Sequence, residues 1–517
     1  MRRTLLLLLC LGVSLPALAK APPQLAVDST YNVDDAVSDK GGATALRRIV
    51  RRASDDDKRA ETALELAREL GISGDDARPD QQLETTLFGK RLIIGGEAGL
   101  GTRFRKNYEL VRGSDDDDLT FDPEVKLEAI YLPSQSTVVF TSAKLFAETT
   151  PYKQGGGAEA AAGIELSEFW LLKTGLFKTP LAVQLGRQQI QERREWWWDE
   201  DLDAARLHFF GKKVTASAAI AREFGNKTTL GRLDPEDKRI LRYLGNVRWD
   251  WADRQQFEFY ALHQNDRSRG YQVGDLIRSN RVDESDANLT WAGLRVRGRV
   301  KSKLPGKFYY WANVARVRGK GKLFDLDDFN AAQDIVTSVT RRKVGGSAFD
   351  AGISLELPFS FKPYVTFGYA RGSGDKNRGS GRNRAFRQTG LHNNNGKFRG
   401  LSRFRYYGEV LRPELSNIGI STLAFGIPIG ETRWIETIWH RYRQPVADNR
   451  IAGSRLDTDP NGISRKLGDE IDVIFSYRSD SPWEFELTAG AFRAGSAFGS
   501  EKGRVAGLIE AKLDYNF

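Results

Sequence analysis

The last nine residues constrain the fold of this chain more than any other segment. Polar residues there alternate strictly with apolar ones, and the apolar set is Ile509, Ala511, Leu513, Tyr515 and Phe517. A strand with one face in lipid and the other in water needs this period of two. The last strand of a soluble sandwich is the alternative, but it would need a second sheet to cover the apolar face. The ending therefore predicts a transmembrane β-barrel.

Similar segments recur from about residue 86 to the C-terminus. One of them alternates Leu241, Tyr243, Val247, Trp249 and Trp251 with polar or basic neighbours. We count about 16 to 19 such segments, and single-chain bacterial barrels normally have an even number. No apolar run after the N-terminus reaches the roughly 18 residues of a spanning helix, and the mean hydropathy is −0.47. These features favour an all-β, antiparallel outer-membrane barrel over residues 86–517.

The N-terminus indicates export. Arg2 and Arg3 precede the apolar run Leu5–Leu15, and Ala17-Leu18-Ala19 resembles a cleavage site. We interpret residues 1–19 as a secretory signal peptide rather than an uncleaved anchor, because the apolar run is short. The only cysteine, Cys10, lies within it. The mature chain is therefore expected to lack disulfides and thiolate metal sites.

Residues 20–85 form a polar, charge-dense extension. Within it, Ser54 and Asp57 resemble a capping box, apolar residues then recur at helical spacing, and Gly71 is placed to end the helix. We expect a short helix in a mobile periplasmic tail. A plug in the pore, or an element that docks a partner, is the alternative.

Long stretches rich in Gly, Asp and Arg separate the predicted strands. They predict surface or channel-folded loops at about 108–119, 150–162, 191–201, 266–285, 320–345, 372–400 and 445–467. Shorter turns, such as Ser479-Asp480-Ser481-Pro482, are expected on the periplasmic side. We interpret the triple tryptophan Trp196–Trp198 as an interfacial aromatic anchor, with stacking on sugar rings as the alternative.

The sequence offers no reactive constellation. Its four histidines are scattered, and neither a metal-spaced His pair, a nucleophile elbow nor a phosphate-binding loop is present. We expect no enzyme activity, cofactor or metal. The formal net charge of +10 suits an anionic solute or lipid surface better than nucleic acid in an exported chain.

Arginines supply the functional signal. On one predicted strand Arg295, Arg297 and Arg299 oppose an apolar face, and further arginines do the same elsewhere: Arg403, Arg405, Arg242 and Arg248. A charge facing lipid costs roughly 2 to 4 kcal/mol at the midplane, so these side chains should line the lumen. Guanidiniums in a narrow tube attract anions. The alternative is that they merely balance acidic lumen neighbours such as Asp250, Glu409 and Asp472.

Several segments resemble the alginate export porins. The most specific block comprises Gly368–Gly374, Gln388–Leu391, Phe398, Gly408-Glu409 and Glu414–Asn417; others are Glu168–Trp170, Gly186–Gln188, Trp198-Asp199 and Pro235–Lys238. The matches run in family order from about residue 164 to the C-terminus. The resemblance implies a barrel of about 18 strands with an electropositive constriction that passes alginate outward.

The resemblance places Arg403 among the pore arginines and Asp199 among the acidic lumen groups. It also suggests Arg187 and Arg371, although strict alternation groups both with outward apolar residues, which would put them at strand ends or past bulges. Gln189, Ser167 and Glu486 stand where the family has basic residues, so the polymer could differ from alginate.

We therefore expect an anion-selective porin of the Gram-negative outer membrane that exports an anionic exopolysaccharide. Its expected partners are that polymer, outer-membrane lipid and a periplasmic scaffold of a secretion complex. A general or uptake porin for small anionic solutes or oligosaccharides is the alternative.

Overall fold

The computed structural model describes residues 56–71, 82–111, 117–153, 158–230, 237–266, 271–278, 287–300, 306–330, 333–377 and 380–517. The predicted signal peptide, Ser54 and most of the polar extension lie outside these residues. No described helix is both long and apolar enough to cross a membrane.

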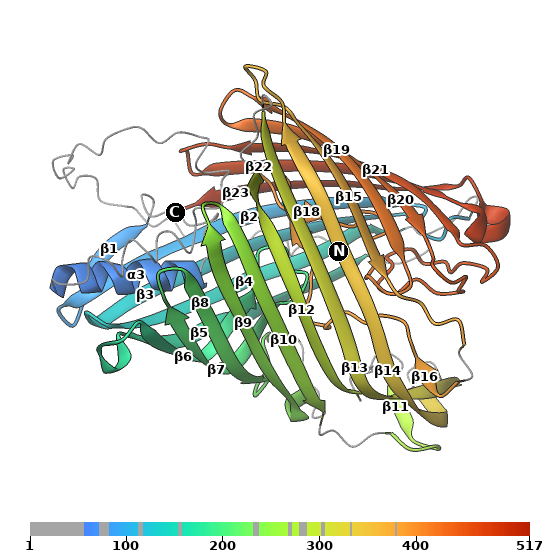
Figure 1. Cartoon of the computed structure of the whole chain (residues 1–517), viewed down its shortest axis with the longest axis horizontal. Helices are drawn as coiled ribbons and strands as arrows, with labels where there is room; N and C mark the ends of the chain where they lie inside the picture. The colour runs from blue at the N-terminus through green and yellow to red at the C-terminus, as the bar shows by residue number, and fades with distance from the viewer. Residues whose placement is uncertain are drawn as a thin grey trace, which may run out of the picture.

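Eighteen strands of the described chain close into one antiparallel barrel (Figure 1), which confirms the predicted fold. Their bounds are β2 (Lys90–Lys106), β3 (Asp118–Ser134), β4 (Thr137–Lys153), β5 (Glu159–Thr174), β6 (Leu181–Gln191), β7 (Asp199–Phe210), β8 (Val214–Arg222), β9 (Ile240–Ala252), β10 (Gln255–Asp266), β12 (Ala287–Val300), β13 (Lys307–Asn330), β14 (Gln333–Glu356), β15 (Tyr364–Gly372), β19 (Gly419–Ile429), β20 (Arg433–Arg443), β21 (Lys466–Arg478), β22 (Trp483–Ala494) and β23 (Val505–Asn516).

The C-terminal strand closes the ring. β23 pairs with β2, with Leu513 opposite Leu100, and the backbone N–H groups of Gly96 and Phe517 donate to each other's carbonyls at 2.8 and 3.0 Å. The outer side chains Ile509 and Phe517 remain 53% and 37% exposed. The alternation in the sequence therefore distinguishes the lipid face from the lumen face.

The two ends of the barrel differ. Short turns at 135–136, 211–213, 253–254 and 430–432 lie at the end where β2 begins and β23 finishes, whereas the connections 192–198, 373–418 and 444–465 lie at the other. Outer-membrane barrels have short periplasmic turns and long extracellular loops. We therefore call the short-turn end periplasmic.

Two segments differ from the sequence prediction. The loop expected at 320–345 is wrong, because β13 and β14 continue as paired strands from Lys307 to Glu356. Beyond the membrane, basic residues replace apolar ones on the outer face of both strands. The alternation of apolar and polar residues that predicts a lipid-facing strand is therefore lost there. The strand expected around Arg403 and Arg405 is also wrong: β18 (Phe404–Arg405) pairs only with β17 (Asn395–Gly396), in a separate small sheet.

Six minor elements complete the described fold. They are the short strands β1 (Leu83–Leu87), β11 (Leu276–Arg278) and β16 (Arg382–Asn383), and the 3-10 turns η2 (Leu176–Lys178), η3 (Asp237–Arg239) and η4 (Ser496–Glu501).

The predicted helix is present as α3 (Asp56–Gly71) and ends at Gly71. Its Ala63, Leu64 and Ala67 are fully buried. They pack in one cluster with wall residues near the periplasmic ends of β2 to β7, among them Ile130, Val138, Phe140, Trp170 and Leu172. Those wall residues alternate with exposed outward ones, so the helix lies against the inner face. The structure therefore places this segment against the lumen wall, where helix and wall bury each other's apolar side chains.

Candidate functional site

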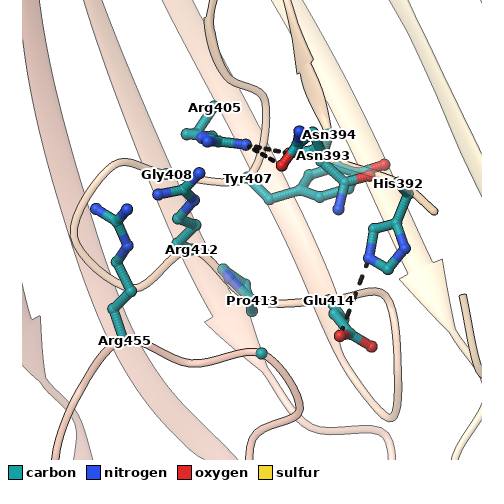
Figure 2. Close-up of a pocket in the computed structure, with 11 residues that line it drawn as sticks. His392, Asn393, Asn394, Arg405, Tyr407, Gly408, Arg412, Pro413, Glu414 and Arg455 are labelled. Carbon is teal, nitrogen blue, oxygen red and sulfur yellow. Dashed lines mark hydrogen bonds and ion pairs between the residues drawn. The ribbon is translucent and has the colours of Figure 1, made fainter. Parts of the chain in front are cut away.

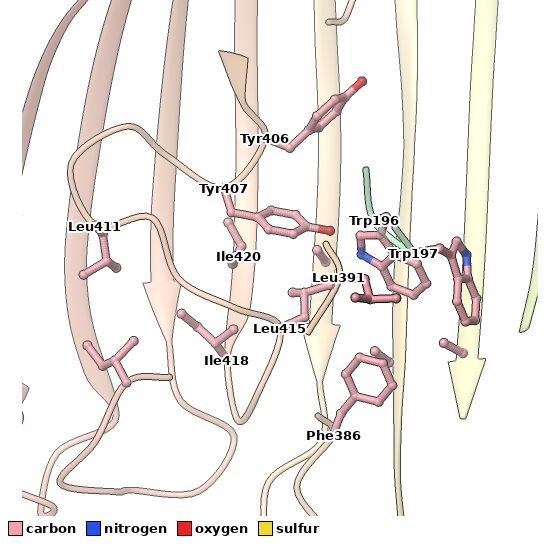
Figure 3. Packing of buried hydrophobic residues seen from close by; sticks show 14 of the residues in the cluster. Trp196, Trp197, Phe386, Leu391, Tyr406, Tyr407, Leu411, Leu415, Ile418 and Ile420 are labelled. Atoms are coloured by element: carbon pink, nitrogen blue, oxygen red, sulfur yellow. The ribbon is translucent and has the colours of Figure 1, made fainter. Parts of the chain in front are cut away.

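Two loops fold into the lumen and line it. The short inner loop (residues 192–198) connects β6 to β7, and the long inner loop (residues 373–418) connects β15 to β19. Trp196, Trp197 and Trp198 are only 1 to 3% exposed, and Trp197 stacks on the inward Tyr260 of β10 with 5.3 Å between ring centroids. Figure 3 shows Trp196 and Trp197 beside apolar side chains of the long inner loop.

The interfacial-anchor interpretation of the tryptophans is therefore wrong. Gly293 on β12 leaves room for this packing, because a Cβ there would come within 2.4 Å of the Trp197 ring. The aromatic surface that we assigned to the membrane is buried against the inner wall instead.

A buried ion pair joins the short inner loop to the wall. Arg295 of β12 donates to both carboxylate oxygens of Glu192, at 3.0 Å to one of them. The same carboxylate accepts the backbone N–H groups of Arg194, Trp196 and Trp197 at 3.1, 2.6 and 3.1 Å. Burial alone would raise the pKa of Glu192, but Arg295 and these N–H groups lower it to about 2.

Asp350 of β14 makes a second connection, to both loops. The Arg194 guanidinium donates to it at 2.7 Å, and the Tyr407 hydroxyl of the long inner loop donates to it at 2.8 Å. Arg194 also lies 3.9 Å from the centroid of the Tyr406 ring. Removing one member of such a buried group costs about 3 to 5 kcal/mol, so the loops are firmly attached to the wall.

Arg403 belongs to the long inner loop, and its side chain contacts the short inner loop instead of facing an open pore. Its guanidinium donates to Glu195 at 2.5 Å and to the backbone carbonyl of Arg193 at 3.2 Å. Burial raises the pKa of Glu195 to about 8, and Arg403 only partly offsets this effect. At neutral pH this pair therefore carries a net positive charge.

Most of the other predicted lumen arginines face inward but have acidic neighbours. Arg297 lies 3.9 Å from Glu258, and Arg242 lies 3.5 Å from Glu223. Arg248 lies on the inward face of β9, as Arg242 does. Arg299 is the third of the arginines that the sequence predicted for one face of β12. The balancing alternative therefore describes Arg295, Arg297 and Arg242, although their partners are not the acids we named.

Three further residues that the family resemblance suggested, Arg187, Asp199 and Arg371, lie in different parts of the barrel. Arg187 forms a two-point pair with Asp203 at 3.0 and 3.1 Å and lies in the wall. Asp199 accepts from Gln189, Gln191 and Asn393 at 2.9 to 3.1 Å, at the edge of the long inner loop. Arg371 lies on the outer face of β15 with the exposed Phe367 and Tyr369. We therefore leave Arg371 out of the pore lining.

Two cavities are relevant to the site, and both are lined in part by the loop 444–465. One, of about 200 Å³, lies between the long inner loop and the loop 444–465; its lining includes His392, Arg405, Arg412, Glu414 and Arg455. Figure 2 shows the three arginines on one side of it. The other, of about 220 Å³, is lined by residues of β2 to β5 and again by Arg455 of the loop 444–465. Its lining holds both charges: Arg103 and Arg105 of β2, and Asp118, Glu148 and Glu159 of β3 to β5, with Arg105 paired to Asp118. The shared arginine makes them neighbours along one path.

Arg412 and Arg455 differ from the other arginines of the lumen. Neither lies within 4.0 Å of a carboxylate of any described residue, and the Arg405 guanidinium donates only to the backbone and side-chain oxygens of Asn393, at 2.6 and 3.1 Å. Burial, with repulsion from Arg103, lowers the pKa of Arg455. A positive charge that lies beside a cavity and has no carboxylate within ion-pair distance is what an anionic ligand would neutralise.

Our sequence analysis did not select Arg103, Arg105, Arg412 or Arg455. The first two could have been found, since they alternate with Thr102 and Phe104 on β2 as the β12 arginines do on theirs. The last two lie in loops, where no periodicity marks a side chain as inward. Among the described residues, no group of three or more His, Asp and Glu side chains could hold a metal ion.

Comparison with known proteins gives a consistent result. Residues 147–511 match the family model described as Alginate export. The chain is 26% identical over 357 residues to the alginate production protein AlgE of Pseudomonas aeruginosa, covering 64% of this chain and 70% of that protein. Identity to AlgE of Azotobacter vinelandii is 25% over 313 residues, covering 56% of this chain and 61% of that relative, less than two thirds of its length.

Among solved structures, the OccK5 (OpdH) protein of Pseudomonas aeruginosa is similar with a TM-score of 0.49 at 10% identity, over 82% of this chain and 98% of that one. This likeness is too slight to bear on function. The family match spans well over half of the sequence. This chain therefore belongs to the alginate export family and forms a β-barrel of the Gram-negative outer membrane.

Proposed function

We propose that this barrel exports an anionic exopolysaccharide, alginate or a similar polyuronate, through an anion-selective passage. The observation that carries the proposal is the pair of loop arginines, Arg412 and Arg455, that face the two cavities without a carboxylate partner. Membership of the alginate export family supports the choice of polymer.

The chemistry of a polyuronate suits this arrangement. Each uronate residue carries one carboxylate, and a guanidinium can bind a carboxylate through two parallel hydrogen bonds. Arg405 and Arg412 line one cavity, and Arg455 lines both. Arg103 and Arg105 line the other cavity, where a polymer carboxylate would compete with their partners Asp122 and Asp118. A polymer could exchange its carboxylates between successive arginines, because conduction needs sites that bind weakly enough to release.

The attached inner loops define where the polymer would pass. The ion pairs from Arg295 and Arg194 fix the short inner loop against β12 and β14. One cavity lies beside the long inner loop, and the other lies between the wall of β2 to β5 and Arg455 of the loop 444–465. We therefore place the passage between that wall and the loops 373–418 and 444–465. We assign no reaction to the protein, so turnover is not part of the proposal.

Current through single barrels in planar bilayers tests this function. We expect uronate oligomers to block the current, and the combined substitution Arg412→Gln and Arg455→Gln to weaken the block by about tenfold or more, since hydrogen bonds to charged groups contribute about 1.5 to 3 kcal/mol each. Arg441→Gln is the matched control, because Arg441 is 63% exposed on the outer face and pairs with Asp469.

The same current recordings distinguish polymer export from the alternative function, a porin for small anions. A porin for small anions would be blocked as well by monomeric uronate as by oligomers of equal carboxylate concentration. An exporter with several sites along one path should prefer the oligomer, because linked carboxylates bind with a high effective concentration.

A further inference from the structure

The extracellular end of the β13–β14 hairpin carries a basic patch on its outer face. We define this patch as the side chains that are exposed there: Arg316, Arg318, Lys320, Arg341 and Lys343. It lies outside the passage and is independent of the proposed function.

Alternation along β13 shows that the patch faces away from the lumen. Val314 is 50% exposed on the same face, whereas the intervening Ala315 and Val317 are 5% and 0% exposed. On β14 the outward neighbour Phe349 is 38% exposed. Apolar side chains at this face belong to the lipid belt. The basic patch therefore begins where the belt ends.

The register brings like charges together. Lys320 lies directly opposite Lys343, and Lys322 lies opposite Arg341; one step nearer the belt, Arg318 lies opposite Gly345 and Arg316 opposite Ser347. Like charges at directly opposed positions destabilise a strand pair. None of the five patch residues forms an ion pair within 4.0 Å with a described residue. An anion from outside the chain would relieve the repulsion.

The height of the patch above the apolar belt indicates which anion it would meet. A strand rises about 3.3 Å per residue and tilts by about 40°, so Arg316, Arg318 and Lys320 lie roughly 5, 10 and 15 Å above Val314 along the membrane normal. The head-group layer extends about 5 to 8 Å beyond the hydrocarbon core. Arg371, on the same outer face beside Phe349, lies near the lower edge of this layer. Arg316 therefore lies in the head-group layer, whereas Arg318, Lys320 and Lys343 lie above it and reach head-group phosphates by extending their long side chains towards the membrane.

We propose that the basic patch is a binding site for phosphorylated lipid head groups of the outer leaflet, of the lipid A type with two phosphates. The emerging polysaccharide is the competing anion, but the patch faces the surrounding lipid and not the pore exit. Basic residues near a membrane surface bind anionic head groups with roughly additive strength.

Retention of lipid A by the purified full-length barrel tests the site. Native mass spectrometry would count bound bisphosphorylated lipid A in detergent for wild type, for the triple variant Arg316→Gln/Arg318→Gln/Lys320→Gln, and for a matched control. The control Lys178→Gln/Lys212→Gln/Lys213→Gln removes the same charge from exposed periplasmic turns. We expect the triple variant to bind about a hundredfold more weakly than wild type and the control to be unchanged.

Three outcomes would overturn the proposal. The first is equal binding by the triple variant and the control, and the second is undiminished binding of lipid A stripped of its phosphates. The third is displacement of lipid A by uronate oligomers at the concentration that blocks the pore, which would reassign the patch to the polymer. Heat-modifiable migration in gels confirms that each variant is folded, and retained current block shows that the passage is intact.

Discussion

Substituting Arg295 with glutamine tests whether the short inner loop is held to the wall by one buried ion pair. The side chains of Arg295 and Glu192 are 1% and 6% exposed, so the substitution leaves a carboxylate buried without its cation. The pKa of Glu192 lies at about 2 instead of 4.5. At about 1.4 kcal/mol per pH unit, that difference corresponds to about 3 kcal/mol, which agrees with the roughly 3 to 5 kcal/mol cost of breaking a buried pair.

Tryptophan accessibility measures the effect. If the loop detaches, Trp196 to Trp198 become accessible, so acrylamide should quench more emission in Arg295→Gln than in wild type. Because the pKa of Glu192 is lower in the folded protein, this stabilisation is present above pH 4.5 and is lost as the pH falls towards 2. Wild type should therefore show the same increase in quenching in strong acid.

A double-mutant cycle provides the control. Combining Arg295→Gln with Glu192→Gln removes both charges, so the double variant should lose less stability than Arg295→Gln alone. Arg441→Gln, at an exposed pair, should cost at most about 0.5 kcal/mol. Unchanged quenching in Arg295→Gln, or a coupling energy below about 1 kcal/mol, would refute the assignment of this pair as the attachment.

Three further predictions concern the charge, the helix and the tryptophan packing. Because burial raises the pKa of Glu195 to about 8, anion selectivity in bilayers should fall as the pH rises through 8 and the carboxylate cancels Arg403; Glu195→Gln should abolish this dependence. With Cys10 replaced, a cysteine at Ala63 should react with a water-soluble maleimide about tenfold more slowly than one at the exposed Glu65, and equal rates would show that α3 is not docked. Gly293→Ala should destabilise the aromatic packing by about 1 to 3 kcal/mol, measured by thermal melting, whereas an unchanged melting temperature would contradict the close approach.

The barrel could be predicted because its signal is local. Lipid on one side and water on the other impose a period of two on every strand, and the C-terminal segment shows it over nine residues. The same rule correctly placed Arg295 and Arg297 inward. It failed on β13 and β14 beyond the membrane, where the outer face also meets water and polar head groups, so Lys320 and Lys343 look like loop residues.

Whether an individual arginine is paired with a carboxylate could not be predicted from the sequence. Glu192 and Arg295 are separated by 103 positions, and Arg403 meets a carboxylate 208 positions away. Such pairs depend on which loops fold inward, and loop sequences carry no periodicity that reports it. The tryptophan run misled for the same reason: an aromatic cluster suits a membrane interface and a buried lumen equally well.

The central claim is that arginines beside the inner loops make the passage selective for anionic polymer. Efflux of labelled oligosaccharides from liposomes that contain the folded barrel tests it most directly. We expect uronate oligomers to leave faster than neutral oligomers of equal length, and Arg412→Gln/Arg455→Gln to remove most of this preference while Arg441→Gln keeps it. Equal efflux of neutral and charged oligomers through the wild-type barrel would contradict the account.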